Sequence, residues 1–119
     1  MTLHYILLLG MATWPHGKYT SYVNPIVLPP QRISIFITGR HEGSLSLQGV
    51  VNMQDNFFFD VRKDGTLDIQ LSMDFLRNLK SFHCVIASAE YDFKKDYARL
   101  TLKMPLVNKL NIIMRKTPN

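Results

Sequence analysis

Cysteine, long hydrophobic runs and catalytic motifs are all scarce in this chain of 119 residues. The single cysteine, Cys84, excludes an internal disulfide, so the stability of the fold must come from its core. Because Cys84 lies in the alternating stretch SFHCVIAS, we expect a buried small hydrophobe and not a reactive thiol.

The apolar run near the N-terminus, from Tyr5 to Ala12, is too short to cross a bilayer, which takes about 20 residues. We find no longer run later in the chain and predict no membrane span. The run is typical of a secretory signal, and we interpret residues 1–17 as a candidate signal peptide. A first strand buried in the core is the alternative. A secreted or extracellular location is the resulting prediction.

Residues for catalysis or metal binding do not form a known arrangement. The serines lack a G-x-S-x-G pattern, and the glycines lack the spacing of phosphate-binding loops. No metal-ligand spacing relates the four histidines, which are His4, His16, His41 and His83. We therefore predict no enzyme activity, no cofactor and no metal.

Acidic residues are absent beyond Asp96, although the net charge of the chain is +5. The basic C-terminal segment, residues 106–119, is expected either to add a strand around Leu110 to Met114 or to remain a tail. Residues 98–119 also contain no aromatic residue, and binding of single-stranded nucleic acid relies on aromatic stacking. We predict no nucleic-acid partner.

Stretches in which apolar and polar residues alternate are common in this chain. Hydrophobic residues make up 46% of the chain and charged residues 19%. This composition fits one globular domain, which we place at residues 18–105. Strands are predicted in RISIFITG, SLSLQGVV, SFHCVIASA and YARLTLKM. SFHCVIASA is apolar on both faces, so we expect a central strand with Phe82 facing inward.

The strongest local signal is a hairpin within FFFDVRKDGTLDIQLSMD, residues 57–74. Its turn is Asp64-Gly65, and both positions are expected to have positive φ. The apolar side chains expected to face inward are Phe57, Phe59, Val61, Leu67, Ile69, Leu71 and Met73. The segment DFLRNLKSF then predicts a short helix near 74–81 with Asp74 as its cap.

About seven short strands and no long helix describe an all-β fold and favour a Greek-key β-sandwich. A closed barrel is the competing arrangement, because periodicity alone does not distinguish the two.

Three motifs follow one another in a fixed register. LSLQG at 45–49 precedes FFFDVRKDGTLDI at 57–69, and Met73-Asp74-Phe75-Leu76 comes next. The alternation from Phe82 to Glu90 and the closing stretch YARLTLKM complete the series. In this order the chain resembles a cadherin repeat. The resemblance implies a seven-stranded Greek-key sandwich, cadherin-like or immunoglobulin-like, with a role in cell adhesion.

Cadherin repeats bind calcium through carboxylates, and most of the matching positions here are not acidic. Gln31 stands at one of these positions and Leu76 at another. Asp74 and Glu90 remain, with Asp92 nearby, whereas calcium takes about six to eight oxygen ligands. These departures imply weak calcium binding or none.

We therefore predict a non-enzymatic, calcium-independent module for extracellular cell adhesion or protein recognition. It would bind a protein partner, or a second copy of itself, through an exposed strand edge or an aromatic patch. The candidate partner-binding residues are Tyr22, Tyr91 and Phe93, of which the last two cluster in one turn where burial is difficult. The alternative is a lectin-like, carbohydrate-binding β-sandwich that uses Arg40, His41 and Glu42.

Overall fold

Eight antiparallel strands and one helix make up the part of the chain that the computed structural model describes, residues 14–23, 31–49, 51–105 and 109–117. The elements are β1 (Gly17–Val23), β2 (Gln31–Ile37), β3 (Glu42–Gln48), β4 (Met53–Val61), β5 (Leu67–Gln70), α2 (Met73–Ser81), β6 (Val85–Asp92), β7 (Tyr97–Lys103) and β8 (Leu110–Lys116). The strands pair in the order β5-β4-β3-β2-β1-β8-β7-β6. Every strand therefore lies beside a neighbour in sequence, and β1 and β8 join the two ends of the chain.

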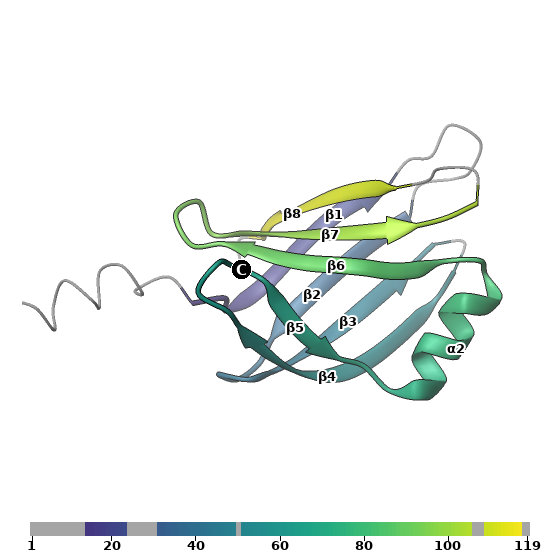
Figure 1. Cartoon of the computed structure of the whole chain (residues 1–119), viewed down its shortest axis with the longest axis horizontal. Helices are drawn as coiled ribbons and strands as arrows, with labels where there is room; N and C mark the ends of the chain where they lie inside the picture. The colour runs from purple at the N-terminus through teal and green to yellow at the C-terminus, as the bar shows by residue number, and fades with distance from the viewer. Residues whose placement is uncertain (1–13, 24–30, 50, 106–108, 118–119) are drawn as a thin grey trace, which may run out of the picture.

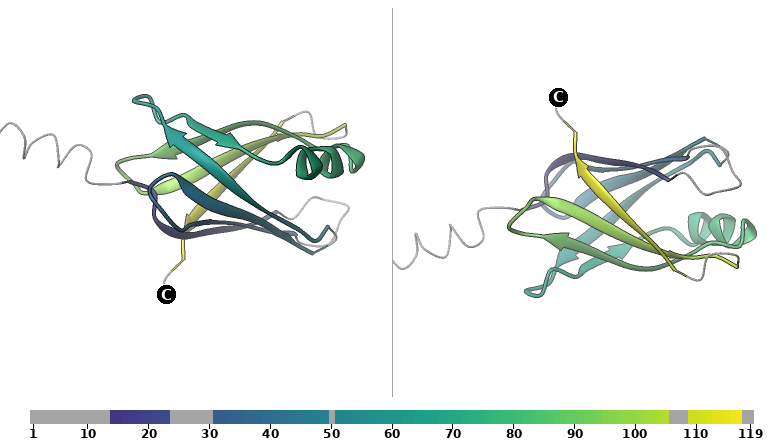
Figure 2. Two further views of the ribbon diagram at one scale, coloured as in Figure 1. Left: turned by 90° about the horizontal axis from the view of Figure 1, so that it is seen from below. Right: turned by 90° about the horizontal axis from the view of Figure 1, so that it is seen from above.

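The sheet curls around a common interior, as the turned views in Figure 2 show, and α2 lies across one end (Figure 1). The all-β prediction is confirmed. The described strands form one sheet of eight in sequential order, however, and not seven strands with Greek-key connections in two sheets. β8 accounts for the difference, because it pairs with both β7 and β1 and so joins β1–β5 and β6–β7 into one continuous sheet. The competing barrel arrangement is thus the nearer description.

Side chains of alternate residues fill the interior. On β2, Ile33, Ile35 and Ile37 are all buried, while Phe36 points outward and is 49% exposed. Tyr19 of β1 and Met114 of β8 are almost completely buried, which makes β8 part of the core and not a tail. Of the predicted signal segment, residues 1–13 lie outside the described residues, and Trp14 and Pro15 pack at one end of the barrel.

The ring closes at a single point. Among the described residues, β5 and β6 are joined by one isolated bridge, Thr66 to Glu90, and by a 2.7 Å hydrogen bond from the Tyr91 N–H to the Gly65 carbonyl. From this point the two strands diverge toward α2 (Figure 1). β5 ends after only four residues, so the barrel is closed at one end and splayed at the other.

The hairpin between β4 and β5 follows the prediction, with one correction. Gly65 has a φ of 94°, but Asp64 does not have the positive φ that we expected. The Gly65 N–H donates to the Arg62 carbonyl, and the Arg62 N–H donates to the Thr66 carbonyl, each at 2.9 Å. This is a three-residue loop that ends in a glycine bulge, so one left-handed residue is enough.

Helix α2 corrects three further predictions. Its cap is Ser72, whose hydroxyl accepts from the Phe75 N–H at 3.1 Å, and not Asp74. The alternation predicts a strand that continues to Met73, but β5 ends at Gln70. Met73 is instead the first residue of the helix and is 71% exposed. Phe82 caps the other end and is 53% exposed. The helix buries Phe75 and Leu79 instead, because these side chains face the barrel.

Strand β6 was predicted to be central, but it is a terminal strand of the sheet. Its apolar residues on both faces do not reflect burial by two neighbours. Val85 is 49% exposed, and Ala87 is exposed as well. Val85 and Ala87 lie in the first half of β6, which borders the splayed end of the barrel.

Replacing Gly65 by alanine is expected to destabilise the fold by about 2–4 kcal/mol. A Cβ at this position would lie 2.6 Å from the Tyr91 carbonyl oxygen, and the positive φ disfavours any L side chain. Urea unfolding of Gly65→Ala measures the loss.

Gly39→Ala is the matched control, because the nearest heavy atom to its added Cβ is 3.7 Å away. We expect a change within about 0.5 kcal/mol for this variant. Equal stability of the two variants would show that the closure at Gly65 does not hold the barrel together.

Candidate functional site

A groove of about 580 Å3 opens to solvent where β5 and β6 diverge. One wall comes from β5 and the residue after it, the other from β6, and α2 closes the end through Leu76. The lining residues are Ile35, Leu45, Phe57, Leu67, Asp68, Ile69, Gln70, Leu71, Leu76, Ile86, Ala87, Ser88, Ala89 and Leu100.

The floor of the groove is apolar and belongs to the barrel core. Ile35, Leu45 and Phe57 come from β2, β3 and β4, and Leu100 comes from β7. All four side chains are at most 4% exposed. A molecule in the groove would thus rest on a rigid apolar surface and need not displace the core.

Polar side chains occur at the rim alone, where Asp68, Gln70 and Ser88 are exposed. Asp68 already accepts a 2.7 Å hydrogen bond from Arg62 Nε, which lies outside the lining. No lysine, arginine or histidine is among the described residues that line the groove. The rim can therefore accept and donate hydrogen bonds, but it offers no cation to neutralise an anionic ligand.

The β6 wall is irregular, with a bulge between Ile86 and Ser88 in its pairing with β7. Bulges twist an edge strand and make it a poor template for a further strand. Ala87 and Ser88 lie at this bulge, are exposed and line the groove, so this part of the mouth carries small side chains.

A second polar cluster lies at the closed end of the barrel. The hydroxyls of Tyr19 and Tyr91 both donate to Asp96 Oδ1 at 2.6 Å, and Lys116 Nζ donates to Asp96 Oδ2 at 3.2 Å. Lys116 Nζ also lies 2.7 Å from His16 Nε2, which must accept, while His16 Nδ1 donates to the Trp14 carbonyl at 2.9 Å.

This cluster stabilises the closed end of the barrel. Burial raises the pKa of the Tyr19 and Tyr91 hydroxyls, and their bonds to Asp96 raise it further. For Asp96, burial works in the opposite sense, but the bonds from both tyrosines and from Lys116 outweigh it and lower the pKa of the carboxyl. The tyrosines therefore stay neutral donors and Asp96 a charged acceptor, which is an arrangement that stabilises the fold.

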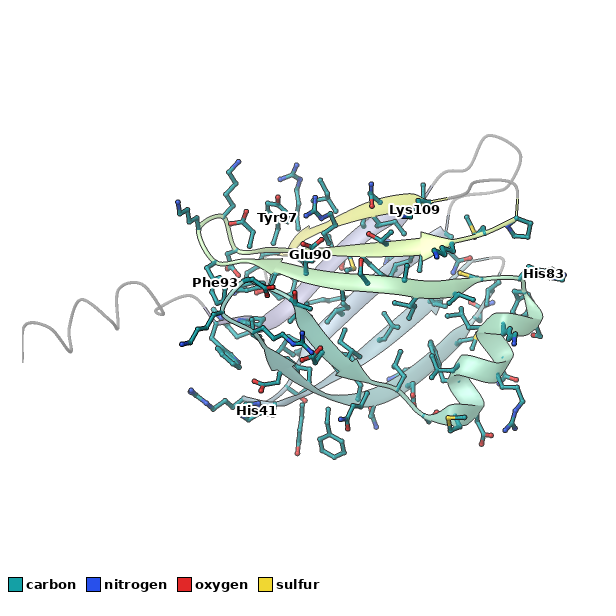
Figure 3. The ribbon with its side chains drawn as sticks, viewed as in Figure 1. His41, His83, Glu90, Phe93, Tyr97 and Lys109 are labelled. Atoms are coloured by element: carbon teal, nitrogen blue, oxygen red, sulfur yellow. The ribbon has the colours of Figure 1, made fainter. Side chains whose placement is uncertain are left out.

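Of the predicted partner-binding residues, Tyr91 is only 3% exposed, so the prediction of a surface position is wrong. Phe93 is half-buried and contacts the Tyr91 ring edge to face, with 5.5 Å between the ring centroids. Figure 3 labels Phe93, which lies at the end of the barrel opposite α2. Burial in this turn succeeds because Asp96 satisfies the Tyr91 hydroxyl. Tyr22 lies opposite Arg32 in the β1–β2 pairing, and its side chain is outside the described residues.

Two of the residues suggested for a sugar site, Arg40 and His41, contact Trp14. The Arg40 guanidinium lies 5.1 Å from the centre of the Trp14 ring, and the His41 ring meets it edge to face at 5.8 Å. Trp14 Nε1 donates to the Arg40 carbonyl at 2.8 Å. The aromatic platform that a lectin-like site needs is thus already covered by Arg40, and Glu42 lies in β3.

The residual acidic positions of the cadherin pattern are not brought together. Asp74 pairs with Arg77 at 3.3 Å on α2, and Glu90 pairs with Arg99 at 3.0 Å on β6 and β7. In the part of the chain that the structure describes, no three His, Cys, Asp or Glu residues are placed to hold a metal ion.

Cys84 is a free, buried thiol, as the sequence predicts, and burial raises its pKa. None of the helices in the described segments is long and apolar enough to span a membrane.

No family model, no curated protein and no solved structure matches this chain.

Sequence reasoning did not find the groove. The alternation assigned Leu67 and Ile69 to the inner face, where both contribute to the lining. The sequence offers one signal for the early end of β5, the N-cap residue Ser72, although the alternation through Met73 predicts a strand there. Divergence of β5 from β6 is a long-range property with no local signature.

Asp96→Asn is expected to lower the free energy of unfolding at neutral pH by about 2 kcal/mol, because hydrogen bonds to a charged group are lost. Asparagine tolerates the positive φ of 54° at this position, so backbone strain is not added. The pKa of Asp96 is lowered by folding, so its stabilisation is present above the unfolded pKa of about 3.9 and is lost as pH falls through the folded value.

The difference in stability between wild type and Asp96→Asn should thus be constant at neutral pH and shrink below about pH 4 in urea titrations. Asp60→Asn, on a side chain that is 69% exposed, is the control and should change stability by less than about 0.5 kcal/mol. A pH-independent gap for Asp96→Asn would contradict the assigned charge.

Proposed function

We propose that this protein is a non-enzymatic binding protein for a small, predominantly apolar molecule, held in the groove between β5, β6 and α2. Sites for such molecules are typically concave, about 300–1,000 Å3 in volume, and apolar with a few polar groups. The groove of about 580 Å3 has this size and this composition. Barrels of eight strands leave room inside for packed side chains or for one small ligand.

The single observation that carries the proposal is the distribution of polarity in the lining. An apolar floor would hold the body of the ligand, and the exposed Gln70 and Ser88 would bond a polar end at the rim. Without a lining cation, and with Asp68 at the mouth, an anionic head group is disfavoured. We therefore expect an uncharged ligand with a hydroxyl or amide end.

Ala87→Trp tests this function by filling the mouth of the groove with a large side chain. Ala87 is exposed, so the fold should tolerate the change. We expect the wild type to bind an uncharged, environment-sensitive apolar dye, and the variant to bind it at least about tenfold more weakly, since several buried CH2 contacts are lost. Fluorescence titration without vesicles or detergent measures both affinities.

Asn56→Trp is the matched control, because it adds the same ring to an exposed position on the outer face of β4. This variant should bind the dye like the wild type. A long-chain alcohol should displace the dye better than the fatty acid of equal length. No dye binding by the wild type, or equal binding by both tryptophan variants, would end the proposal.

The adhesion or protein-recognition role implied by the cadherin resemblance remains a second proposal. What supports it is the open edge of β6, since an exposed strand edge can bind an extended peptide by strand addition. The bulge between Ile86 and Ser88 works against a regular added strand. A secreted location and independence from calcium belong to this role and stay predictions.

A further inference from the structure

The exposed apolar side chains are not spread evenly over the molecule. Among the described residues, seven large hydrophobic side chains are exposed, and four of them lie between Met73 and Val85. These four are Met73 at 71%, Leu76 at 39%, Phe82 at 53% and Val85 at 49%. They belong to α2, to its C-terminal cap and to the start of β6, so all are at the splayed end of the barrel.

We propose that this α2 end is a docking surface for an anionic lipid bilayer. The surface consists of Met73, Phe82 and Val85, with the basic residues Lys80 and Lys103 beside them. In Figure 3, His83 marks this end and Phe93 the opposite end, where the β6–β7 turn carries its own lysines and no exposed large hydrophobic residue among the described ones.

The charge of the surface selects the occupant. Asp74 is the sole acidic residue between positions 73 and 85, and Arg77 pairs with it at 3.3 Å. From outside this segment, the Asp55 carboxylate of β4 accepts a 2.7 Å hydrogen bond from the Ser72 N–H at the start of α2. Lys80 and Lys103 are exposed, and no ion pair holds either one among the described residues; Lys103 lies opposite Val85 in the β6–β7 pairing. Surfaces that bind anionic lipid combine exposed apolar side chains with neighbouring cations that no acidic residue neutralises.

The position of the surface adds a reason for this occupant. Leu76 belongs both to the exposed apolar set and to the groove lining, so the mouth of the groove adjoins the docking surface. An apolar molecule that is dissolved in a bilayer would pass into the groove without crossing water. This step rests on the proposed ligand-binding function, whereas the docking surface itself stands on the exposed residues and their charge.

Binding to vesicles of phosphatidylcholine mixed with phosphatidylserine tests the proposal, with pure phosphatidylcholine vesicles for comparison. We expect the wild type to sediment with the mixed vesicles, less with the neutral ones, and less as salt rises. Met73→Ser combined with Phe82→Ser should weaken binding at least about tenfold, because two apolar side chains no longer enter the interface. Lys80→Gln should weaken binding to the mixed vesicles by about fivefold.

The chain offers matched controls for both changes. Phe36 and Phe58 are exposed at 49% and 62% on the outer face of the sheet, so Phe36→Ser with Phe58→Ser removes as much exposed apolar surface elsewhere. Lys94→Gln removes an exposed lysine from the β6–β7 turn. Both control variants should bind vesicles like the wild type.

Three results would overturn the docking surface: no sedimentation of the wild type, an equal loss in the control pair, or equal binding to neutral and anionic vesicles. A protein partner at this surface would give the first of these results. The dye titration in solution separates the two proposals, because Met73→Ser with Phe82→Ser should leave dye affinity unchanged. Loss of dye binding with retained vesicle binding would remove the ligand groove and keep the docking surface.

Discussion

Contact between the β4–β5 turn and strand β6 is the constraint on which the rest of the structure depends. A sheet with one apolar face must cover that face, and this chain does so by curling its strands until the two end strands meet. They meet through a glycine that has no room for a side chain, where the Gly65 carbonyl accepts the Tyr91 N–H. The tyrosine cluster on Asp96 secures the same end from inside.

Closure at one point has a direct consequence at the other end of the barrel. Because β5 stops after four residues, the first half of β6 is paired with β7 alone in the described part of the chain, and α2 covers only part of the gap through Phe75 and Leu79. The groove is what remains uncovered. Its apolar floor is the ordinary core of the barrel, seen from the one side where no strand shields it. The closure of the barrel at one end and the groove at the other thus have the same origin.

The two proposals describe one end of the molecule from different sides. The groove offers apolar surface toward the interior, and the exposed residues of α2 offer it toward solvent. Proteins commonly expose single apolar side chains, but four within thirteen consecutive positions form a concentration, and the proposed docking surface rests on it. The opposite end is closed by the Asp96 cluster and carries the lysines of the β6–β7 turn.

The sequence by itself determined the all-β class, most of the strands, the inward side of each, the Asp64–Gly65 hairpin, a short helix and the burial of Cys84, because period and turn chemistry are local. Local pattern misplaced Met73 and Phe82, since a helix and a strand compete for short apolar runs and the packing of Phe75 and Leu79 on the barrel decided between them. It placed Tyr91 at the surface, because its partner Asp96 is found only after β1, β6 and β8 meet. Tertiary structure alone decided between sandwich and barrel, and with it the groove, because strand order and divergence depend on which distant edges pair.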